Sequence, residues 1–306
     1  MPDSLTGILC MAYGSPADEA GVEPYFTHIR GGRAPSPAAL AELSGRYRAI
    51  GGSPLASITR DQAAALSALT GLPTYTAFKH APPFIAEGAR LAAADGITRL
   101  IGLPLAPHYA EMSLGGYQRA LAEAWDSELV FVPGFHDHPA FIGAVASLLF
   151  EALAERQPER LFFTAHSLPA RIIAAGDGYH EQLLESCRLV AGRLDLPPWE
   201  FTFQSASATG EPWLGPDLLE AIEQSGAKRV LVCPIGFVAD HLEVLYDLDV
   251  EAKQFARERG LDIRRTASFN DRPEFIRALA AIVADAQAEA GWPAGAGVAG
   301  TPRARP

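Results

Sequence analysis

The stretch Arg160-Leu-Phe-Phe-Thr-Ala-His-Ser-Leu-Pro169 joins a short apolar run to a polar segment that contains a proline. An apolar run of this length without polar alternation is typical of a parallel strand that is buried on both faces. The segment Met11-Ala-Tyr-Gly-Ser-Pro16 ends another apolar run in the same way. The likeness predicts an internal repeat in which Tyr13 and His166 are counterparts, although short apolar strands can also resemble one another by chance.

Seven more apolar runs are interpreted as strands: Gly7–Ala12, Thr74–Phe78, Arg99–Leu105, Leu129–Pro133, Phe201–Gln204, Arg229–Pro234 and Asp262–Ser268. They alternate with stretches of helical period, namely Pro37–Ile50, Thr59–Leu69, Pro83–Ala94, Pro139–Glu155, Tyr179–Leu194 and Pro216–Gln224. Alternation of strands and helices predicts an α/β fold with parallel sheets. The repeat divides it into two similar four-stranded domains that face each other across a cleft.

The predicted domain limits follow from this division. We assign residues 1–143 to the first domain and residues 144–290 to the second, with the last helix, about 272–290, as a candidate to pack back on the first domain. Residues 291–306 are rich in Gly, Pro and Ala without periodicity, and they are predicted to form a disordered tail.

Composition excludes several classes of protein. The chain has 306 residues, and 48% of them are hydrophobic, which predicts one or two globular domains. A net charge of −11 argues against nucleic-acid binding. No apolar run approaches the ~20 residues of a membrane span, so we expect a cytoplasmic monomer without membrane insertion. Cys10, Cys187 and Cys233 lie in apolar segments, as reduced core thiols do.

The segment Gly236-Phe-Val-Ala-Asp-His-Leu-Glu-Val-Leu-Tyr-Asp-Leu-Asp-Val-Glu251 follows a predicted strand and predicts a helix from about Asp240. Glu243, Asp247 and Glu251 stand four residues apart, so a helix places these three carboxylates along one side. A solvated acidic face is one interpretation. The other is a ladder that passes a divalent cation or protons into a pocket, favoured because the ladder begins at the carboxyl end of a strand, beside His241.

His166 lies at the carboxyl end of its predicted strand, where α/β proteins bind ligands. A histidine there can be a hydrogen-bonded structural residue. Together with Glu243, however, it forms an imidazole–carboxylate pair that suits Fe(II) and similar ions. Its pKa range also suits it to accept protons from a weakly acidic N–H group.

Arginines and aromatic residues are interleaved near the N-terminus, in Tyr25-Phe-Thr-His-Ile-Arg-Gly-Gly-Arg33 and Gly45-Arg-Tyr-Arg-Ala-Ile-Gly-Gly-Ser-Pro54. Arginine forks bind carboxylates bidentately, and aromatic rings provide flat apolar surface. The combination fits a large planar ligand with carboxylates at its rim. The alternative is a helical hairpin with solvated arginines.

The motifs quoted above, together with Leu105-Ala-Pro-His-Tyr109 and Pro212-Trp-Leu-Gly-Pro216, resemble the ferrochelatases. The likeness runs from about residue 5 to 285 and is closest to the soluble coproporphyrin-using branch of bacteria. It implies a chelatase-like fold of two Rossmann-like domains with a porphyrin between them. The activity that it implies is insertion of Fe(II) into a free-base porphyrin in haem biosynthesis, with release of two protons. Coproporphyrin III is the preferred substrate, and protoporphyrin IX is a second one.

The resemblance also implies roles for single residues. His166 and Glu243 are the catalytic and metal-binding pair, and Tyr13 is the axial ligand of the iron porphyrin on the opposite face. Asp247 and Glu251 form the outer path for metal and protons. The porphyrin contacts are Arg30, Arg46, Tyr47, Ser53 and Tyr117, although relatives often have one more apolar residue between Gly52 and Ser53.

Some ferrochelatases hold a [2Fe–2S] cluster on cysteines near the C-terminus, but no cysteine follows Cys233 here. We therefore expect no iron–sulfur cluster and no permanently bound cofactor, with Fe(II) as a substrate. The expected partners are the porphyrin, Fe(II), a transient iron donor and a haem-accepting enzyme. Two alternatives stay open: a sirohydrochlorin-type chelatase, and a non-enzymatic haem or metal carrier.

Overall fold

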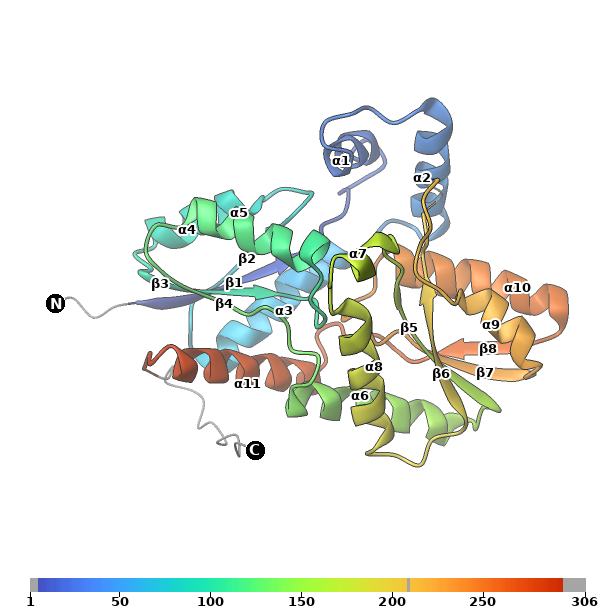
Figure 1. Cartoon of the computed structure of the whole chain (residues 1–306). Helices are drawn as coiled ribbons and strands as arrows, with labels where there is room; N and C mark the ends of the chain where they lie inside the picture. The colour runs from blue at the N-terminus through green and yellow to red at the C-terminus, as the bar shows by residue number, and fades with distance from the viewer. Residues whose placement is uncertain (1–4, 208–209, 294–306) are drawn as a thin grey trace.

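The computed structural model describes residues 5–207 and 210–293, and it contains two four-stranded parallel sheets (Figure 1). The first sheet has the order β2-β1-β3-β4 and the second has the order β6-β5-β7-β8. The strands are β1 (Thr6–Ala12), β2 (Thr74–Phe78), β3 (Arg99–Pro104), β4 (Glu128–Phe131), β5 (Arg160–His166), β6 (Trp199–Gln204), β7 (Arg229–Cys233) and β8 (Asp262–Arg265). The eight predicted strands and the α/β class are confirmed, and the shared strand order agrees with the predicted repeat.

Helices cover both faces of each sheet. The first half contains α1 (Val22–Ile29), α2 (Pro37–Ala49), α3 (Leu55–Thr70), α4 (Ile85–Ala94), α5 (Gly116–Ala124) and α6 (Pro139–Glu155). The second contains α7 (Arg171–Ala174), α8 (Tyr179–Ala191), α9 (Leu218–Ser225), α10 (Ala252–Arg259) and α11 (Pro273–Glu289). Two π-helices, η1 (Glu111–Gly115) and η2 (Glu243–Glu251), occupy equivalent places after β3 and β7. A π-helix at both positions extends the repeat beyond the sheets.

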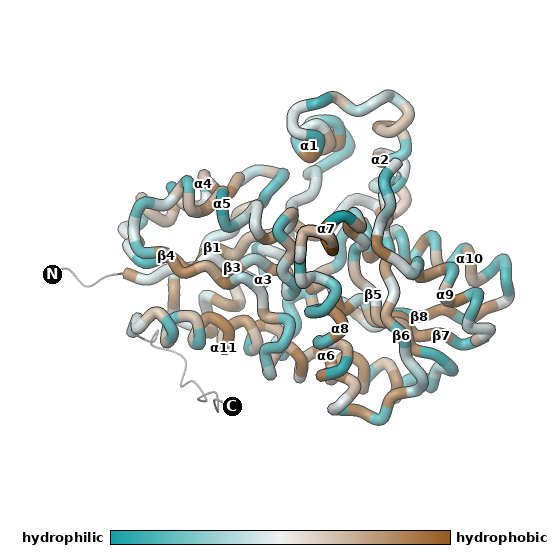
Figure 2. Tube along the Cα trace, in the orientation of Figure 1, coloured by the Kyte–Doolittle hydropathy of each residue, from teal (hydrophilic) through white to brown (hydrophobic). Residues whose placement is uncertain are grey.

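One apolar core joins the two halves. It contains Ile8 and Leu103 of the first sheet, Leu161 and Phe203 of the second, and Phe141 of α6. The proposed boundary at residue 143 lies inside α6, so the chain passes between the sheets along a continuous helix. Helix α11 packs against α3, α6 and β3, which places the last helix beside the first sheet (Figure 1). Figure 2 shows the hydrophobic strands inside and hydrophilic segments on outer helices such as α10.

The start of the predicted tail is ordered. Trp292 donates its backbone N–H to the carbonyl of Gln287, and the guanidinium of Arg99 lies 5.7 Å from the Trp292 ring centre. Residues 291–293 therefore do not belong to a disordered tail, because this contact holds them to the first sheet. The remainder of the predicted tail, 294–306, lies outside the described residues.

Two further observations concern the cysteines and the membrane. Cys10, Cys187 and Cys233 are buried free thiols in β1, α8 and β7, as predicted. None of the helices in the described ranges has the length and apolar character that crossing a membrane requires.

Helices α1 and α2 form an excursion that rises above the sheets (Figure 1). Val22, Tyr25 and Tyr47 from this excursion share an apolar cluster with Leu242, and Tyr246 packs against it. Leu242 and Tyr246 belong to the η2 region of the second half. The first half therefore reaches over and holds the segment that carries the acidic residues.

Candidate metal and porphyrin site

Gln204 brings the two predicted metal ligands to one edge of the second sheet. It pairs with His166 across β5 and β6, and its Nε2 donates to the backbone carbonyl of Glu243 at 3.2 Å. The Thr164 hydroxyl donates to Gln204 Oε1 at 2.8 Å, which fixes the orientation of the buried amide. His166 and the start of η2 are therefore held on either side of one oriented side chain.

The hydrogen bonds of His166 define its tautomer. Its Nδ1 lies within hydrogen-bonding distance of the Ser167 carbonyl, and its own carbonyl accepts from the Tyr179 hydroxyl at 3.1 Å. Because a carbonyl can only accept, Nδ1 carries the proton of the neutral ring. The Nε2 lone pair is then left to bind a metal or to accept a proton. The ring centre lies 6.4 Å from that of Trp213.

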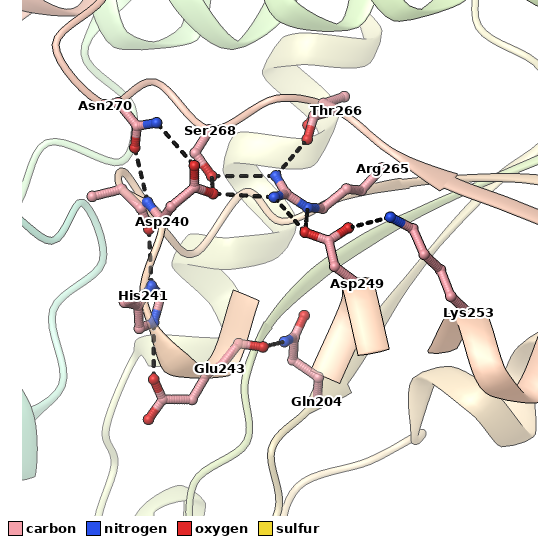
Figure 3. A network of polar contacts seen from close by, with 11 residues as sticks. Gln204, Asp240, His241, Glu243, Asp249, Lys253, Arg265, Thr266, Ser268 and Asn270 are labelled. Carbon is pink, nitrogen blue, oxygen red and sulfur yellow. Dashed lines mark hydrogen bonds and ion pairs between the residues drawn. The ribbon is translucent and has the colours of Figure 1, made fainter. Parts of the chain in front are cut away.

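Glu243 lies beside the ring of His241. His241 donates from Nδ1 to the Ala239 carbonyl at 2.8 Å, and its Nε2 lies 3.2 Å from Glu243 Oε2 (Figure 3). The backbone therefore holds the imidazole on one side, and the ring faces the carboxylate of Glu243 on the other.

The helix that carries the ladder differs from the prediction. A regular helix from about Asp240 was expected, but the π-helix η2 begins at Glu243. Asp240 donates its backbone N–H to Asn270 Oδ1 at 2.9 Å, outside the helix. Gln204 supplies an external donor to the first carbonyl of η2. These external partners replace regular helical hydrogen bonds, and π-helical turns of this kind are frequent at functional sites.

The carboxylate ladder is electrostatically coupled. Burial raises the pKa of Asp247 to about 7, and the charges of Glu243 and Glu251 add to the increase. The Ser205 hydroxyl, which donates to Asp247 Oδ2, and the nearby Arg46 oppose it. Ser205 has a φ of +64°, a left-handed conformation that is uncommon for a residue other than glycine. Asp247 therefore titrates near neutral pH, between two carboxylates of the same helix.

Tyr13 follows β1 and is the counterpart of His166. Its ring is 40% exposed and lies 4.6 Å from the ring of His80. Burial by surrounding protein, followed by the charge of Glu243, raises the pKa of Tyr13 well above its usual value. Tyr13 is thus a neutral phenol at physiological pH, and it comes from the opposite half of the molecule to Glu243.

Two other predicted porphyrin contacts are buried. Tyr47 packs edge-to-face with Tyr25 at 6.4 Å in the cluster that holds η2. Tyr117 lies in the core beside Met11, with Lys79 Nζ 5.3 Å from its ring centre. These two rings are packed inside apolar clusters, whereas Tyr13 is exposed.

The arginines of the two N-terminal segments already have partners within the protein. Most of them contact an acidic or an aromatic side chain. Arg46 pairs with Glu42 at 2.9 Å, and its guanidinium lies 5.1 Å from the Tyr246 ring centre. Arg48 pairs with Glu19 at 3.1 Å. Arg30 lies 5.6 Å from the ring centre of Phe26, and Arg33 donates to the carbonyl of Arg30.

Ser53 is half-buried, and its hydroxyl accepts the backbone N–H of Leu55 at 3.3 Å. This contact stabilises the beginning of α3. Any contact of Ser53 with a ligand would share the hydroxyl with this local role.

Sequence reasoning missed three polar residues at the ends of strands. Lys79 and His80 directly follow β2, and Gln204 ends β6. Burial and the charges of Lys79 and His28 lower the pKa of His80 to about 4, and its Nδ1 lies 3.0 Å from that of His28. The rule that ligands bind beyond the carboxyl ends of parallel strands would have selected all three residues.

Comparison with known proteins identifies the family of the chain. The Ferrochelatase family model matches residues 5–287. The chain belongs to the ferrochelatase family. A relative named ferrochelatase, from Herpetosiphon aurantiacus, is 41% identical over 298 residues, with 91% of this chain and 98% of the relative covered. A coproporphyrin III ferrochelatase from Geobacillus sp. is also 41% identical, with 90% and 96% covered.

Solved structures with low sequence identity share the fold of this ferrochelatase. SirB from Bacillus subtilis with Fe3+ has a TM-score of 0.59 at 12% identity, over 94% of this chain and 98% of that one. CbiX, described as the terminal enzyme of sirohaem biosynthesis in denitrifying bacteria, has a TM-score of 0.56 at 15% identity, over 90% and 97%. At these identities the likeness concerns the fold alone. The chain is a metal chelatase that inserts iron into a porphyrin.

Proposed function

We propose that this ferrochelatase inserts Fe(II) into coproporphyrin III held between Tyr13 on one side and His166 and Glu243 on the other. The observation that carries the proposal is that Gln204 pairs with His166 across β5 and β6 and donates to the backbone carbonyl of Glu243, which holds both groups at one edge of the second sheet. The charge of Glu243 also raises the pKa of Tyr13, which belongs to the opposite half of the molecule. The Nε2 lone pair of His166 provides the second group for the metal. Relatives at about 40% identity that are named coproporphyrin III ferrochelatases support the choice of substrate.

The proposed metal ligands suit an Fe(II) ion that is bound only until it moves into the porphyrin. Within residues 5–207 and 210–293, no group of three or more His, Cys, Asp or Glu side chains forms a metal centre. His166 and Glu243 offer one imidazole nitrogen and one carboxylate, a mixed set that Fe(II) accepts. Two ligands hold the ion weakly enough for the four ring nitrogens to displace them. Displacement transfers the metal from the protein to the porphyrin.

Insertion releases the two pyrrole N–H protons, and the site provides acceptors for them. His166 Nε2 takes one proton at a time from the ring. Asp247, with a pKa of about 7, then binds and releases protons at neutral pH. Glu251 is exposed and completes the path to solvent. The ladder on η2 therefore serves the return of protons as well as the entry of iron.

Tyr13 acts on the opposite face as the axial ligand of the iron porphyrin. Its raised pKa keeps it a neutral phenol, which binds iron more weakly than a phenolate does, so that product can leave. Arg30 and Arg46 bind the rim carboxylates. The Arg46–Glu42 pair is exposed at the surface, where such pairs contribute ~0–1 kcal/mol, so a substrate carboxylate can replace Glu42. The remaining contacts on the porphyrin side are provided by Tyr47, Ser53 and Tyr117.

The rest of the proposal concerns the cell. The enzyme works in the cytoplasm as a monomer, without an iron–sulfur cluster, and exchanges iron and haem with transient partners. A sirohydrochlorin-type chelatase is the second candidate, because SirB and CbiX share the fold. Their low identity to this chain makes it the weaker one.

An anaerobic insertion assay tests the substrate. Purified enzyme is given Fe(II) with coproporphyrin III, protoporphyrin IX or sirohydrochlorin, and loss of the free-base spectrum is followed. We expect coproporphyrin III to give the highest kcat/KM. A higher kcat/KM with sirohydrochlorin would overturn the proposal. Tight haem binding without loss of any free base would identify a carrier instead.

A further inference from the structure

Arg265, the last residue of β8, joins both ends of the segment that carries Glu243. Its Nη2 lies 3.1 Å from Asp240 Oδ1 and 2.7 Å from Asp249 Oδ2, and its Nε lies 3.1 Å from the same Asp249 oxygen (Figure 3). Asp240 precedes His241, and Asp249 lies near the end of η2. One guanidinium thus closes a bridge across the segment 240–249.

The bridge is half-buried and balanced in charge. The side chains of Arg265, Asp240 and Asp249 are 15%, 21% and 25% exposed. Lys253 Nζ lies 3.0 Å from Asp249 Oδ1, so two cations face two carboxylates. The Ser268 hydroxyl donates to Asp240 Oδ1 at 2.7 Å. A network of this kind fixes geometry, and loss of one charged member leaves the others uncompensated.

The same network reaches the first half of the molecule. Asn270 Nδ2 donates to Asp240 Oδ2 at 2.9 Å, and Gln62 Nε2 on α3 donates to the carbonyl of Asn270 at 2.7 Å. Asn270 has a φ of +48°, which asparagine tolerates better than most residues. The position of the segment 240–249 is therefore tied to α3, and α3 belongs to the half that carries Tyr13.

We propose that Arg265 is a positioning residue for iron insertion, acting through Asp240 and Asp249 on the placement of His241 and Glu243. The inference rests on the proposed role of Glu243 in binding the metal. A π-helix is rare and appears mostly as a single turn, so a nine-residue π-helix requires restraint from outside. Arg265 supplies such a restraint through Asp240, which precedes η2, and through Asp249 inside it, and Glu243 lies between these two aspartates in the sequence.

A cavity of about 420 Å³ makes the proposal testable by chemical rescue. Arg265, Asp249, Lys253 and the neighbouring Arg264 all line it. Its volume exceeds that of a guanidinium ion many times over. A guanidinium ion from solution can therefore reach Asp249 and the space that the side chain of Arg265 leaves when it is removed.

The experiment compares Arg265→Ala with Arg264→Ala. Arg264 lines the same cavity, but it pairs with Glu155 at 3.4 Å and with the Arg156 carbonyl at 2.6 Å, away from the segment 240–249. We expect Arg265→Ala to lower kcat for Fe(II) insertion ~10–100-fold, as a misplacement of about 1 Å does. The Kd for porphyrin, from fluorescence quenching, should stay within about twofold. Guanidinium at about 50 mM, far below the molar range that unfolds proteins, should restore much of the kcat that Arg265→Ala loses.

The control variant Arg264→Ala should keep wild-type kcat, and guanidinium should not change its kcat.

Other outcomes separate the inference from the function on which it rests. Wild-type kcat in a folded Arg265→Ala variant overturns the positioning role. A loss of kcat that guanidinium does not restore, with a melting temperature equal to that of Arg264→Ala, overturns it as well. If Arg265→Ala does not fold, Arg265→Lys takes its place, because one ammonium cannot bridge both aspartates. Its kcat should fall with porphyrin Kd unchanged, and unchanged kcat contradicts the role. Full activity of Glu243→Gln would instead remove the proposed metal ligand, whatever Arg265 does.

Discussion

The two halves of the molecule share one strand order and place a π-helix after the third strand, yet they differ in the chemistry of matching residues. At the end of the first strand, one half has the phenol of Tyr13 and the other has the imidazole of His166. The first residues of η1 and η2 are both glutamates, Glu111 and Glu243, but their partners differ. A repeated scaffold thus offers a neutral ring on one side and the proposed metal ligands on the other.

The two glutamates show how the difference arises. Glu111 accepts from the Tyr109 hydroxyl at 2.5 Å and pairs with Arg119, so its charge is satisfied locally. Glu243 has only the ring of His241 as an ion-pair partner in the part of the chain that the structure describes. A carboxylate without a fixed cation can bind a metal ion, whereas one paired with arginine cannot do so without losing that pair. The same residue type is therefore paired with arginine in η1 and, within the described residues, free of an arginine or lysine partner in η2, where we propose its chemical role.

The largest effect is expected at the pair of counterparts that follow the first strands. His166→Ala removes the Nε2 lone pair and should lower kcat ~10²–10⁴-fold, the usual contribution of a positioned base, while porphyrin still binds. Tyr13→Phe keeps the ring and removes only the axial oxygen, so we expect a change of less than about tenfold, mainly in product release. Single-turnover and steady-state assays with Fe(II) measure both variants.

The reverse order would contradict the assignment of the two faces. Near-normal turnover of His166→Ala would remove it from the metal side. A complete loss of activity in Tyr13→Phe would mean that the phenol takes part in insertion itself.

The glutamates provide the next comparison. Glu243→Gln keeps the size of the side chain but loses the charge, and we expect kcat/KM for Fe(II) to fall ~10–100-fold, the size of effect attached to one positioned charged group. Glu111→Gln makes the same change at the matching residue of η1 and should leave kcat/KM within about twofold. Steady-state kinetics with Fe(II) as the varied substrate measure the difference. Equal losses in the two variants would show that the charge matters only for π-helix structure.

The strands could be predicted from the sequence because each one is a short apolar run. The one large boundary error is at β8, predicted to reach Ser268 but ending at Arg265. The last residue of the strand and a residue beyond it hydrogen-bond through their side chains instead: Arg265 and Ser268 both contact Asp240. Such contacts with residues distant in sequence leave no periodic signal. The sequence did not reveal the π-helix either. Carboxylates four residues apart lie on one side of an α-helix, in which each N–H bonds to the fourth residue before it, and nearly so in a π-helix, in which it bonds to the fifth.

The candidate site could be predicted where chemistry and strand ends coincide. His166 ends β5, Tyr13 follows β1 and Glu243 begins the π-helix after β7, so all three lie beyond or at the carboxyl ends of strands, as predicted. The environment of each side chain could not be predicted. Burial of Tyr47 and Tyr117 depends on how α2 and α5 pack, and the pairing of Arg48 with Glu19 joins residues 29 positions apart. The burial of the two tyrosines and the Arg48–Glu19 pair both depend on tertiary contacts, which the local sequence does not reveal.

The last comparison concerns stability and not activity, and it sets two aspartates of η2 that face different surroundings against each other. Asp247 has a pKa of about 7 in the folded protein because of burial and neighbouring carboxylates, against 3.8 in the unfolded chain. Between these values the folded state binds more protons, so the free energy of unfolding falls as pH rises from about 4 to 7. Asp247→Asn abolishes this titration. The variant should gain up to about 4 kcal/mol over wild type at pH 8, about 2 kcal/mol at pH 5 and less than about 1 kcal/mol at pH 4.

Asp249, two residues further on, should give the opposite slope. Burial raises its pKa, but hydrogen bonds and charges from Arg265 and Lys253 outweigh this and lower it below the usual value. Its stabilising effect is therefore present at neutral pH and is lost as pH falls through the folded pKa. Asp249→Asn should destabilise the protein at pH 7 and less so at acidic pH. Urea unfolding of both variants between pH 4 and 8 measures the two slopes. If the free energy of unfolding depended on pH in the same way for both variants, the predicted difference between the two aspartates would be wrong. Burial and repulsion by neighbouring carboxylates would then not raise the pKa of Asp247, and the carboxylate ladder would be contradicted.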